Sequence, residues 1–231
     1  MKLSNRLQAI ANFIPKNSMV ADIGTDHGYI PMYLIEKKIS KQVIASDVSQ
    51  GSLNKTISYI KDLKMEDKVI PRLGDGLEVI KPFEVDTVVI AGMGGLLIKE
   101  ILDKDLNITN SITNFILQPM IASIELREYL INNNFKIIDE DLIKEDDKFY
   151  EVIFAKKGKD YIEKEINFEI SKQILEKKHP LIKEFIDHKI LMAKNILNNL
   201  ESKTSEKSKS RYEELEKHIL DYQEVLRRIE G

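Results

Sequence analysis

The stretch of residues 20–31, VADIGTDHGYIP, decides the fold of this chain. Its apolar beginning is typical of a buried strand, and helical spacing of apolar residues starts after Gly28. A strand, a glycine-containing turn and a helix in one short segment let backbone N–H groups approach a ligand closely. Asp22 ends the strand, so we expect its carboxylate to face the crevice at the carboxyl edge of a sheet.

Strand and helix patterns alternate through the first two thirds of the chain. Apolar runs bounded by turn residues recur at residues 19–23, 42–46, 68–73, 87–91 and 114–118, with helical patterns such as 53–64 and 96–102 between them. This alternation predicts a parallel sheet with helices on both faces. Residues 136–142 and 149–156 then predict an antiparallel pair, joined by a hairpin-like segment at 143–148. Five strands with helices followed by a hairpin resemble the order of class I methyltransferases, a seven-stranded Rossmann-like α/β fold that binds S-adenosyl-L-methionine.

The tail of the chain has a different pattern. After Pro180, apolar residues repeat at helical spacing up to Leu200, and they do so again from Tyr212 to Ile229. The polar segment 202–210 between the two runs is typical of a loop. We therefore predict two domains, residues 1–160 with the sheet and residues 161–231 as an antiparallel α-helical coiled-coil hairpin. The hairpin either protrudes as an arm, packs against the sheet domain or forms a dimer contact.

Composition limits the class of protein. The 231 residues carry a net charge of −3, which argues against a globally basic nucleic-acid binder. Cysteine is absent, which excludes a disulfide framework and thiolate metal sites. The sequence also has no apolar run of membrane-spanning length, so we expect a cytoplasmic protein without a membrane partner.

Each predicted strand ends in residues suited to holding a nucleoside. An acid at Asp47 can accept both ribose hydroxyls, and Asp75 between glycines can take an adenine amino group. Taken singly, Asp47 could instead cap a helix, and Asp75 could sit in an Asx turn. The candidate cofactor-binding residues are Asp22, Gly24, Asp26, His27, Gly28, Asp47, Val48, Gly74, Asp75, Gly76, Ala91, Gly92, Met93 and Gly94.

The first loop distinguishes between cofactors. A dinucleotide site requires three glycines in the pattern G-x-G-x-x-G, so that a pyrophosphate can rest on a helix N-terminus. Here the loop is Gly24-Thr25-Asp26-His27-Gly28, with an acid where the pyrophosphate would lie. A carboxylate repels a diphosphate but suits the sulfonium and amino groups of S-adenosyl-L-methionine. The charge therefore favours the methyl donor.

The sequence resembles the bacterial tRNA (adenine-22-N1)-methyltransferases. The motifs that carry the resemblance are ADIGTDHGYIP, ASDVSQGSLNK, GDGLEVI, VVIAGMGG, LQP and EDDKFYEVI, between residues 21 and 153. The resemblance covers nearly the whole chain, because that family also has a C-terminal helical hairpin. Ser52 departs from the proline expected after Gly51, on the cofactor side. The resemblance implies methylation of N1 of an adenine in the D-arm of tRNA, with S-adenosyl-L-methionine as donor and tRNA as partner.

Three residues are candidates for the chemistry, which needs no metal. Asp26 can stabilise the cationic product ring or serve as a cofactor ligand, and Tyr29 can stack on the target base or fill a packing face. Gln118 can pair with an adenine edge or cap a strand. The candidate substrate-binding residues are His27, Pro119, Lys203, Lys207, Lys209 and Arg211, with Arg6 and Lys16 as weaker additions.

Two other functions remain open from the sequence. The same fold could methylate another RNA base or a small molecule, with the hairpin as a lid or dimer element. A non-catalytic tRNA-binding module is the other alternative, and the acids and glycines at the strand ends argue against it. We expect a monomer or a weak homodimer.

Overall fold

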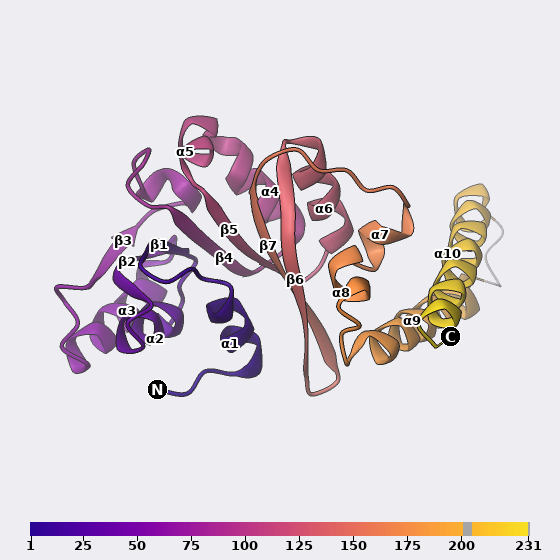
Figure 1. Cartoon of the computed structure of the whole chain (residues 1–231), viewed down its shortest axis with the longest axis horizontal. Coiled ribbons are helices and arrows are strands. Elements are labelled where there is room, and N and C mark those ends of the chain that lie inside the picture. Colours follow the sequence, from indigo (N-terminus) through magenta and orange to yellow (C-terminus); the bar gives the residue numbers. More distant parts are fainter. Residues whose placement is uncertain (201–204, 231) are drawn as a thin grey trace. The chain divides into compact units, whose positions relative to one another are not determined.

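The structure is a computed structural model that describes residues 1–200 and 205–230. It contains two compact units, Met1–Tyr161 and Ile162–Gly231. The first unit is built on a seven-stranded sheet, and the second consists of helices in its described part (Figure 1).

The sheet has the strand order β3-β2-β1-β4-β5-β7-β6. The first five strands are parallel to one another, and β7 lies between β5 and β6 and is antiparallel to both. The predicted Rossmann-like methyltransferase fold is confirmed. The strands are β1 (Ser18–Ile23), β2 (Ser40–Asp47), β3 (Val69–Leu73), β4 (Thr87–Met93), β5 (Asn114–Pro119), β6 (Phe135–Glu145) and β7 (Lys148–Lys157).

The β6–β7 hairpin is tighter than its sequence indicated. Residues 143–148 were predicted as a connecting segment, but Ile143 pairs with Tyr150 and Glu145 pairs with Lys148. The turn is therefore limited to residues 146 and 147. The acids of this segment belong to paired strands, because alternate side chains of a strand can point to solvent without breaking the ladder.

Helices cover both faces of the sheet. One hydrophobic core lies between the sheet and α4, α5 and α6, and the other lies between the sheet and α1, α2 and α3. In β4, Val88 and Ile90 belong to the first core, whereas Val89 belongs to the second. Burial on both faces explains why the strands read as continuous apolar runs. The helices of this unit are α1 (Asn5–Asn12), α2 (Tyr29–Glu36), α3 (Gln50–Asp62), the 3-10 helix η1 (Gly76–Val79), α4 (Gly95–Lys104), α5 (Leu106–Ser111) and α6 (Ser123–Asn132).

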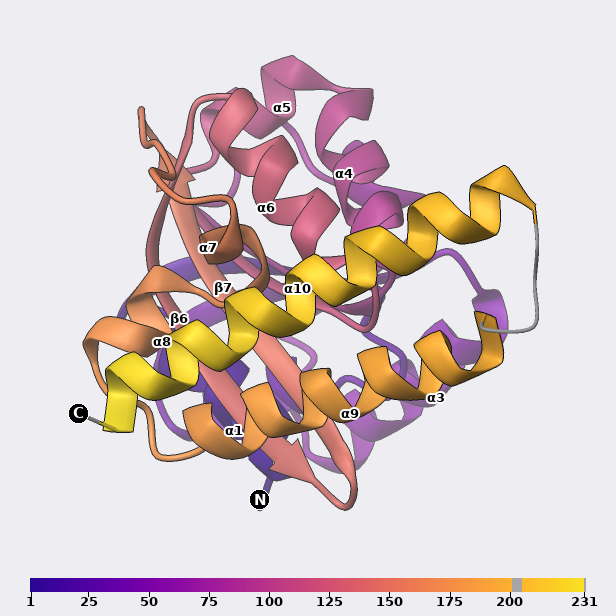
Figure 2. The ribbon, with the colours of Figure 1, turned by 90° about the vertical axis from the view of Figure 1, so that its right-hand side faces the viewer.

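The second unit contains two long helices, α9 (Ile182–Leu200) and α10 (Glu206–Glu230), which run side by side (Figure 2). The short helices α7 (Ile166–Glu169) and α8 (Lys172–Glu176) precede them. Apolar side chains at helical spacing are buried in the pair: Phe185, Ile186, Ile190, Ala193, Leu197, Leu215, Ile219, Tyr222 and Val225. The predicted loop at 202–210 was too long, because residues 206–210 are already helical. No helix in residues 1–200 and 205–230 is long and apolar enough to cross a membrane.

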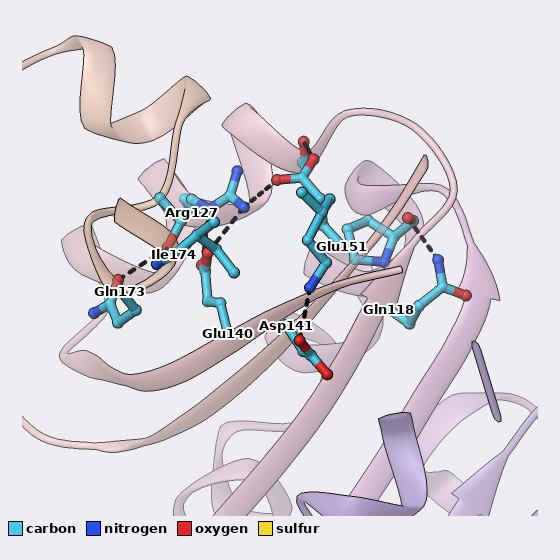
Figure 3. A network of polar contacts seen from close by, with 11 residues as sticks. Gln118, Arg127, Glu140, Asp141, Glu151, Gln173 and Ile174 are labelled. Carbon is cyan, nitrogen blue, oxygen red and sulfur yellow. Dashed lines mark hydrogen bonds and ion pairs between the residues drawn. The ribbon is translucent and has the colours of Figure 1, made fainter. Parts of the chain in front are cut away.

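A buried ionic network joins α6 to the β6–β7 hairpin (Figure 3). Arg127 is 1% exposed, and its Nε donates to Oε1 of Glu140 over 2.8 Å. Its Nη2 also donates to Glu151. Burial alone would lower the pKa of Arg127, but the charges of Glu140 and Glu151 outweigh it and raise that pKa. The arginine stays charged inside the protein because two carboxylates surround it.

Replacing Arg127 should lower the stability of the folded protein. In Arg127→Met, the carboxylate of Glu140 loses its buried partner, so we expect the free energy of unfolding to fall by about 3–5 kcal/mol. The double variant Arg127→Met/Glu140→Leu removes the second charge as well and should recover most of the loss. Urea unfolding followed by circular dichroism measures both. Equal losses in the two variants would show that packing of the side chain, and not its charge, is what matters.

Candidate active site

The carboxyl ends of β1, β2 and β4 surround two adjoining cavities. The larger, of about 380 Å³, is lined among others by Arg6, Asp22, Asp26, His27, Tyr29 and Met120. The smaller, of about 250 Å³, is lined among others by Asp47, Val48, Gly74, Asp75, Gly76, Met93, Leu97 and Ile101. Gly24, Ala91 and Gly92 line both. The strand-end residues that the sequence singled out thus gather at one place.

The loop after β1 forms the wall common to both cavities. Gly24 has a φ of +74°, and a Cβ at this position would be 2.3 Å from Cε of Met93. A side chain would therefore meet both backbone strain and a clash. The N–H groups of Gly24 and Thr25 donate to the carbonyl of Ser46 over 2.9 and 2.8 Å. These bonds hold the main chain of the loop against the end of β2.

Asp22 is a buried acid in the larger cavity. It is 4% exposed, and its Oδ2 accepts a hydrogen bond from Oγ1 of Thr25 over 2.7 Å. Burial raises the pKa of Asp22 to about 7, the hydrogen bond from Thr25 opposes the rise, and the charge of Asp47 adds to it. This carboxyl group therefore titrates near neutral pH before any ligand binds.

Asp26, His27 and Tyr29 form a connected row along the larger cavity. Oδ2 of Asp26 lies 2.8 Å from Nδ1 of His27, and the His27 ring stacks on Tyr29 with the centroids 5.5 Å apart. The backbone of Asp26 is fixed on both sides. Its N–H donates to Oδ2 of Asp47 over 3.2 Å, and its carbonyl accepts from Oγ1 of Thr56 over 2.8 Å. The Asp26 side chain is 63% exposed, so a ligand can reach its carboxylate.

Two acids face the smaller cavity in different environments. Asp47 is 9% exposed, and its Oδ1 accepts from the N–H of Ser49 over 2.8 Å. Asp75 is exposed, and its Oδ2 lies 2.7 Å from Nζ of Lys104, which also pairs with Glu78 at 2.7 Å. Hydrogen bonds to Asp75 and then to Glu78 raise the pKa of Lys104. Both aspartates are thus oriented by the protein and keep free lone pairs for a ligand.

Gln118 and Pro119 are both buried at the carboxyl end of β5, and Gln118 contacts residues that line the larger cavity. Oε1 of Gln118 accepts from Nη1 of Arg6 over 2.7 Å and from the N–H of Gly92 over 3.2 Å. Its Nε2 donates to the carbonyl of Pro119 over 2.8 Å. The amide oxygen of Gln118 thus contacts Arg6 and Gly92, which both line the larger cavity. That Gln118 and Pro119 bind the substrate stays a prediction.

The remaining predicted residues flank the site or belong to the second unit. Gly28 directly precedes α2, and Gly94 directly precedes α4. Lys207, Lys209 and Arg211 are exposed on α10 and not in a loop, and Nη1 of Arg211 pairs with Glu214 over 2.7 Å. On a helix, Lys207 and Arg211 share a face, whereas Lys209 points to the other side. Lys203 lies outside the described residues.

Sequence reasoning missed three side chains of the site or gave them too little weight. Thr25 lies within residues 20–31, and a hydroxyl three positions after Asp22 indicates a possible hydrogen bond to that acid. Arg6 stood only as a weak candidate, because nothing near it in the sequence shows that it reaches Gln118, 112 positions away. Lys104 has no local signal, because its pairing with Asp75 depends on how α4 packs on the sheet.

The smaller cavity suits an adenosine group. Asp47 and Asp75 offer carboxylates to hydroxyl and amino donors, and Val48, Leu97 and Ile101 offer apolar surface to a flat ring. A Cβ at Gly24 would collide with Cε of Met93, so only a glycine lets the main chain form the wall between the two cavities. On the other side of Gly24, the acids Asp22 and Asp26 suit a cationic group. The residues present fit S-adenosyl-L-methionine across the two cavities.

Comparisons with known proteins agree with this geometry. A family described as a methyltransferase domain matches residues 3–153. A tRNA (adenine(22)-N(1))-methyltransferase of Bacillus subtilis is 39% identical over 158 residues, which are 68% of this chain and 66% of that protein. The crystal structure of the B. subtilis m1A22 tRNA methyltransferase TrmK is 31% identical, with a TM-score of 0.87 over 97% of this chain and 99% of its own. TrmK of M. capricolum, solved in complex with S-adenosyl-homocysteine, is 30% identical, with a TM-score of 0.85 over 99% and 100%.

The buried acid predicts a specific pH dependence of stability. The pKa of Asp22 is higher in the folded protein than in the unfolded chain, so the folded state binds more protons between about pH 4 and pH 7. The contribution of Asp22 to stability is therefore complete at low pH and is lost as the pH rises through about 7. We expect the unfolding free energy of the wild type, minus that of Asp22→Asn, to fall over this range and to level off above it. Urea unfolding at a series of pH values measures the difference, and a pH-independent value would contradict the assignment.

Proposed function

This chain belongs to the family of tRNA (adenine(22)-N(1))-methyltransferases, and from that membership we propose that it methylates N1 of adenine 22 in the D-arm of tRNA. The product is 1-methyladenosine, and S-adenosyl-L-methionine supplies the methyl group when it is bound. The observation that carries the proposal is the pair of cavities on either side of Gly24, each with its own acids.

The smaller cavity holds the adenosine part of the donor. Asp47 accepts the ribose hydroxyls, since its carboxylate is already oriented by two backbone N–H groups. Asp75 accepts the adenine amino group, and Lys104 holds its carboxylate in place. Gly24 lets the main chain lie close to the donor at the junction of the cavities.

The larger cavity receives the target adenine. N1 of neutral adenine carries an in-plane lone pair, so the protein needs mainly to align it, and no residue has to remove a proton before the attack. The N1–carbon bond forms as the sulfur–carbon bond breaks, and the positive charge passes to the adenine ring. Asp26 stabilises that charge as it develops, and Tyr29, 45% exposed, stacks on the ring.

One assay tests this function against its alternatives. The protein is incubated with S-adenosyl-L-methionine and unmodified tRNA, and the nucleosides are then analysed by mass spectrometry. We expect 1-methyladenosine at position 22. A methylated base of another kind or position would favour the alternative acceptor, whereas donor binding without any methyl transfer would favour a non-catalytic module.

The second unit is proposed as the tRNA-holding arm. The relatives of known structure align along 97% or more of this chain, which includes α9 and α10. Lys207 and Arg211 form a basic pair on one face of α10, within reach of phosphates that run beside the arm. The alternative is a contact in a homodimer.

The Asp26 carboxylate should matter for the methyl transfer more than for binding. In Asp26→Asn the side chain keeps its size, and asparagine tolerates the left-handed φ of 49° at this position. We expect single-turnover methyl transfer to fall roughly a hundredfold, because the charge that meets the developing cation is lost. Donor affinity, measured by calorimetry, should change much less. Asp67→Asn, at an exposed position outside both cavities, is the matched control. If donor affinity falls as much as the rate, Asp26 is a donor ligand and has no separate part in the reaction.

Neutralising the arm should weaken tRNA binding in a salt-dependent way. In the variant Lys207→Gln/Arg211→Gln, fewer counterions are released on binding, so the slope of log K against log salt should decrease by about 1–2. Donor binding should stay at the wild-type value. Filter binding at several salt concentrations gives the slopes. An unchanged slope together with a changed sedimentation coefficient would show that the helices serve a dimer contact instead.

A further inference from the structure

The loop between β5 and α6 holds two neighbouring apolar side chains in solvent beside the larger cavity. Met120 lines the cavity and is 44% exposed, and Ile121 is 73% exposed. Ile121 lies against Gly94, since a Cβ on that glycine would be 3.6 Å from Cγ1 of Ile121. We call Met120 and Ile121 the apolar pair. The proposed methyl transfer gives this pair no part, and neither side chain is needed for a core.

The backbone that carries the apolar pair is held in place on both sides. The N–H of Met120 donates to the carbonyl of Met93, and the N–H of Gly95 donates to the carbonyl of Ile121, each over 2.8 Å. Ala122 then adopts a left-handed φ of 59°. A Cβ on Gly95 would be 2.1 Å from the Ala122 carbonyl oxygen, so the two loops touch with no room for a side chain. The apolar pair is therefore presented to solvent at a fixed position.

The buried network of α6 supports the same loop (Figure 3). Ser123, the first residue of α6, donates from its Oγ to Oε1 of Glu151 over 2.8 Å. Glu151 is in turn bound by Arg127. The charged groups that tie α6 to the β6–β7 hairpin thus also fix the point where the exposed loop enters the helix. Since the loop is already ordered, inserting its side chains into a partner costs little conformational entropy.

The target adenine of the proposed substrate must leave its base stack before N1 can react, and exposed apolar side chains can open such a stack. N1 of adenine lies on the Watson–Crick edge, which base pairing and stacking hide from an enzyme. Enzymes that react with a base in a duplex extrude it, which costs a few kcal/mol of unstacking. Proteins that open a stack insert side chains such as Ile, Leu, Met or Phe between adjacent bases.

We propose that the apolar pair is a wedge that enters the base stack of tRNA beside the target adenine. Ile121, the more exposed of the two, replaces the stacking partner of the neighbouring base. Met120 fills the step between that base and the larger cavity, which then receives the extruded adenine. This inference rests on the proposed function and adds the means by which the target leaves its helix.

The test compares two RNAs and two variants of the full chain. One RNA is a tRNA transcript whose target adenine is base-paired in the D-arm, and the other has the pairing base changed, so that the target is unpaired. In Ile121→Ala, we expect single-turnover methylation of the paired RNA to fall at least about tenfold, and that of the unpaired RNA to stay within about twofold of the wild type. Leu106→Ala is the matched control. Leu106 is 54% exposed at the start of α5, which leads into the amino end of β5, at the edge of the sheet away from the cavities.

A second readout follows the opening of the stack directly. With 2-aminopurine placed beside the target adenine, wild-type protein should raise the fluorescence of the paired RNA, and Ile121→Ala should lose most of that rise. Donor affinity, measured by calorimetry, should match the wild type in both variants. Equal rate losses on the two RNAs, or no loss on the paired RNA, would overturn the wedge and leave the proposed methylation intact. A wild-type protein that methylates neither RNA would instead remove the proposed function, and the wedge with it.

Discussion

The site depends on how closely the main chain at Gly24 passes Met93. A single Cβ there would lie 2.3 Å from the methionine side chain, and the left-handed φ of +74° is strained for any other residue. Two hydrogen bonds, from the N–H groups of Gly24 and Thr25 to the carbonyl of Ser46, hold the loop in this position. Because Gly24 lines both cavities, the main chain at this residue forms part of the wall between them. The acids of β1 and β2 are then brought to the same edge by the parallel order of the strands.

The three aspartates at this edge of the sheet, Asp22, Asp26 and Asp47, differ in burial and in hydrogen bonding. Asp22 is buried, and its pKa rises to about 7, so its charge depends on pH and on what binds beside it. Asp47 is oriented by backbone N–H groups, which suits a fixed partner such as ribose. The Asp26 side chain is 63% exposed and lines the larger cavity, so a ligand can reach its carboxylate. Burial, hydrogen bonding and exposure thus give three neighbouring aspartates different properties.

The core and the outer rim of the site are connected through the start of α6. Arg127 is buried among carboxylates, which is a costly arrangement unless its partners are well placed. Ser123 extends this network to the loop that presents Met120 and Ile121. A buried charge that adds little to stability when compared with apolar packing can still be retained if it fixes a surface loop. The network thus links the core of the first unit to an exposed loop beside the larger cavity.

The sequence alone determined the order of strands and helices, the helical tail and the acids at the strand ends. These features follow from local periodicity and from the rule that parallel strands share a carboxyl edge. The tertiary structure alone decided where individual side chains point. Gln118 turned out to be buried against Arg6, Lys104 turned out to hold Asp75, and the β6–β7 turn shortened to two residues. Arg6 and Gln118 are 112 positions apart, as Lys104 and Asp75 are 29 apart, so no local pattern records either contact. Such contacts arise only when separate elements pack on one sheet, which is why composition and spacing indicated the acids and glycines at the strand ends but not the residues that hold them in place.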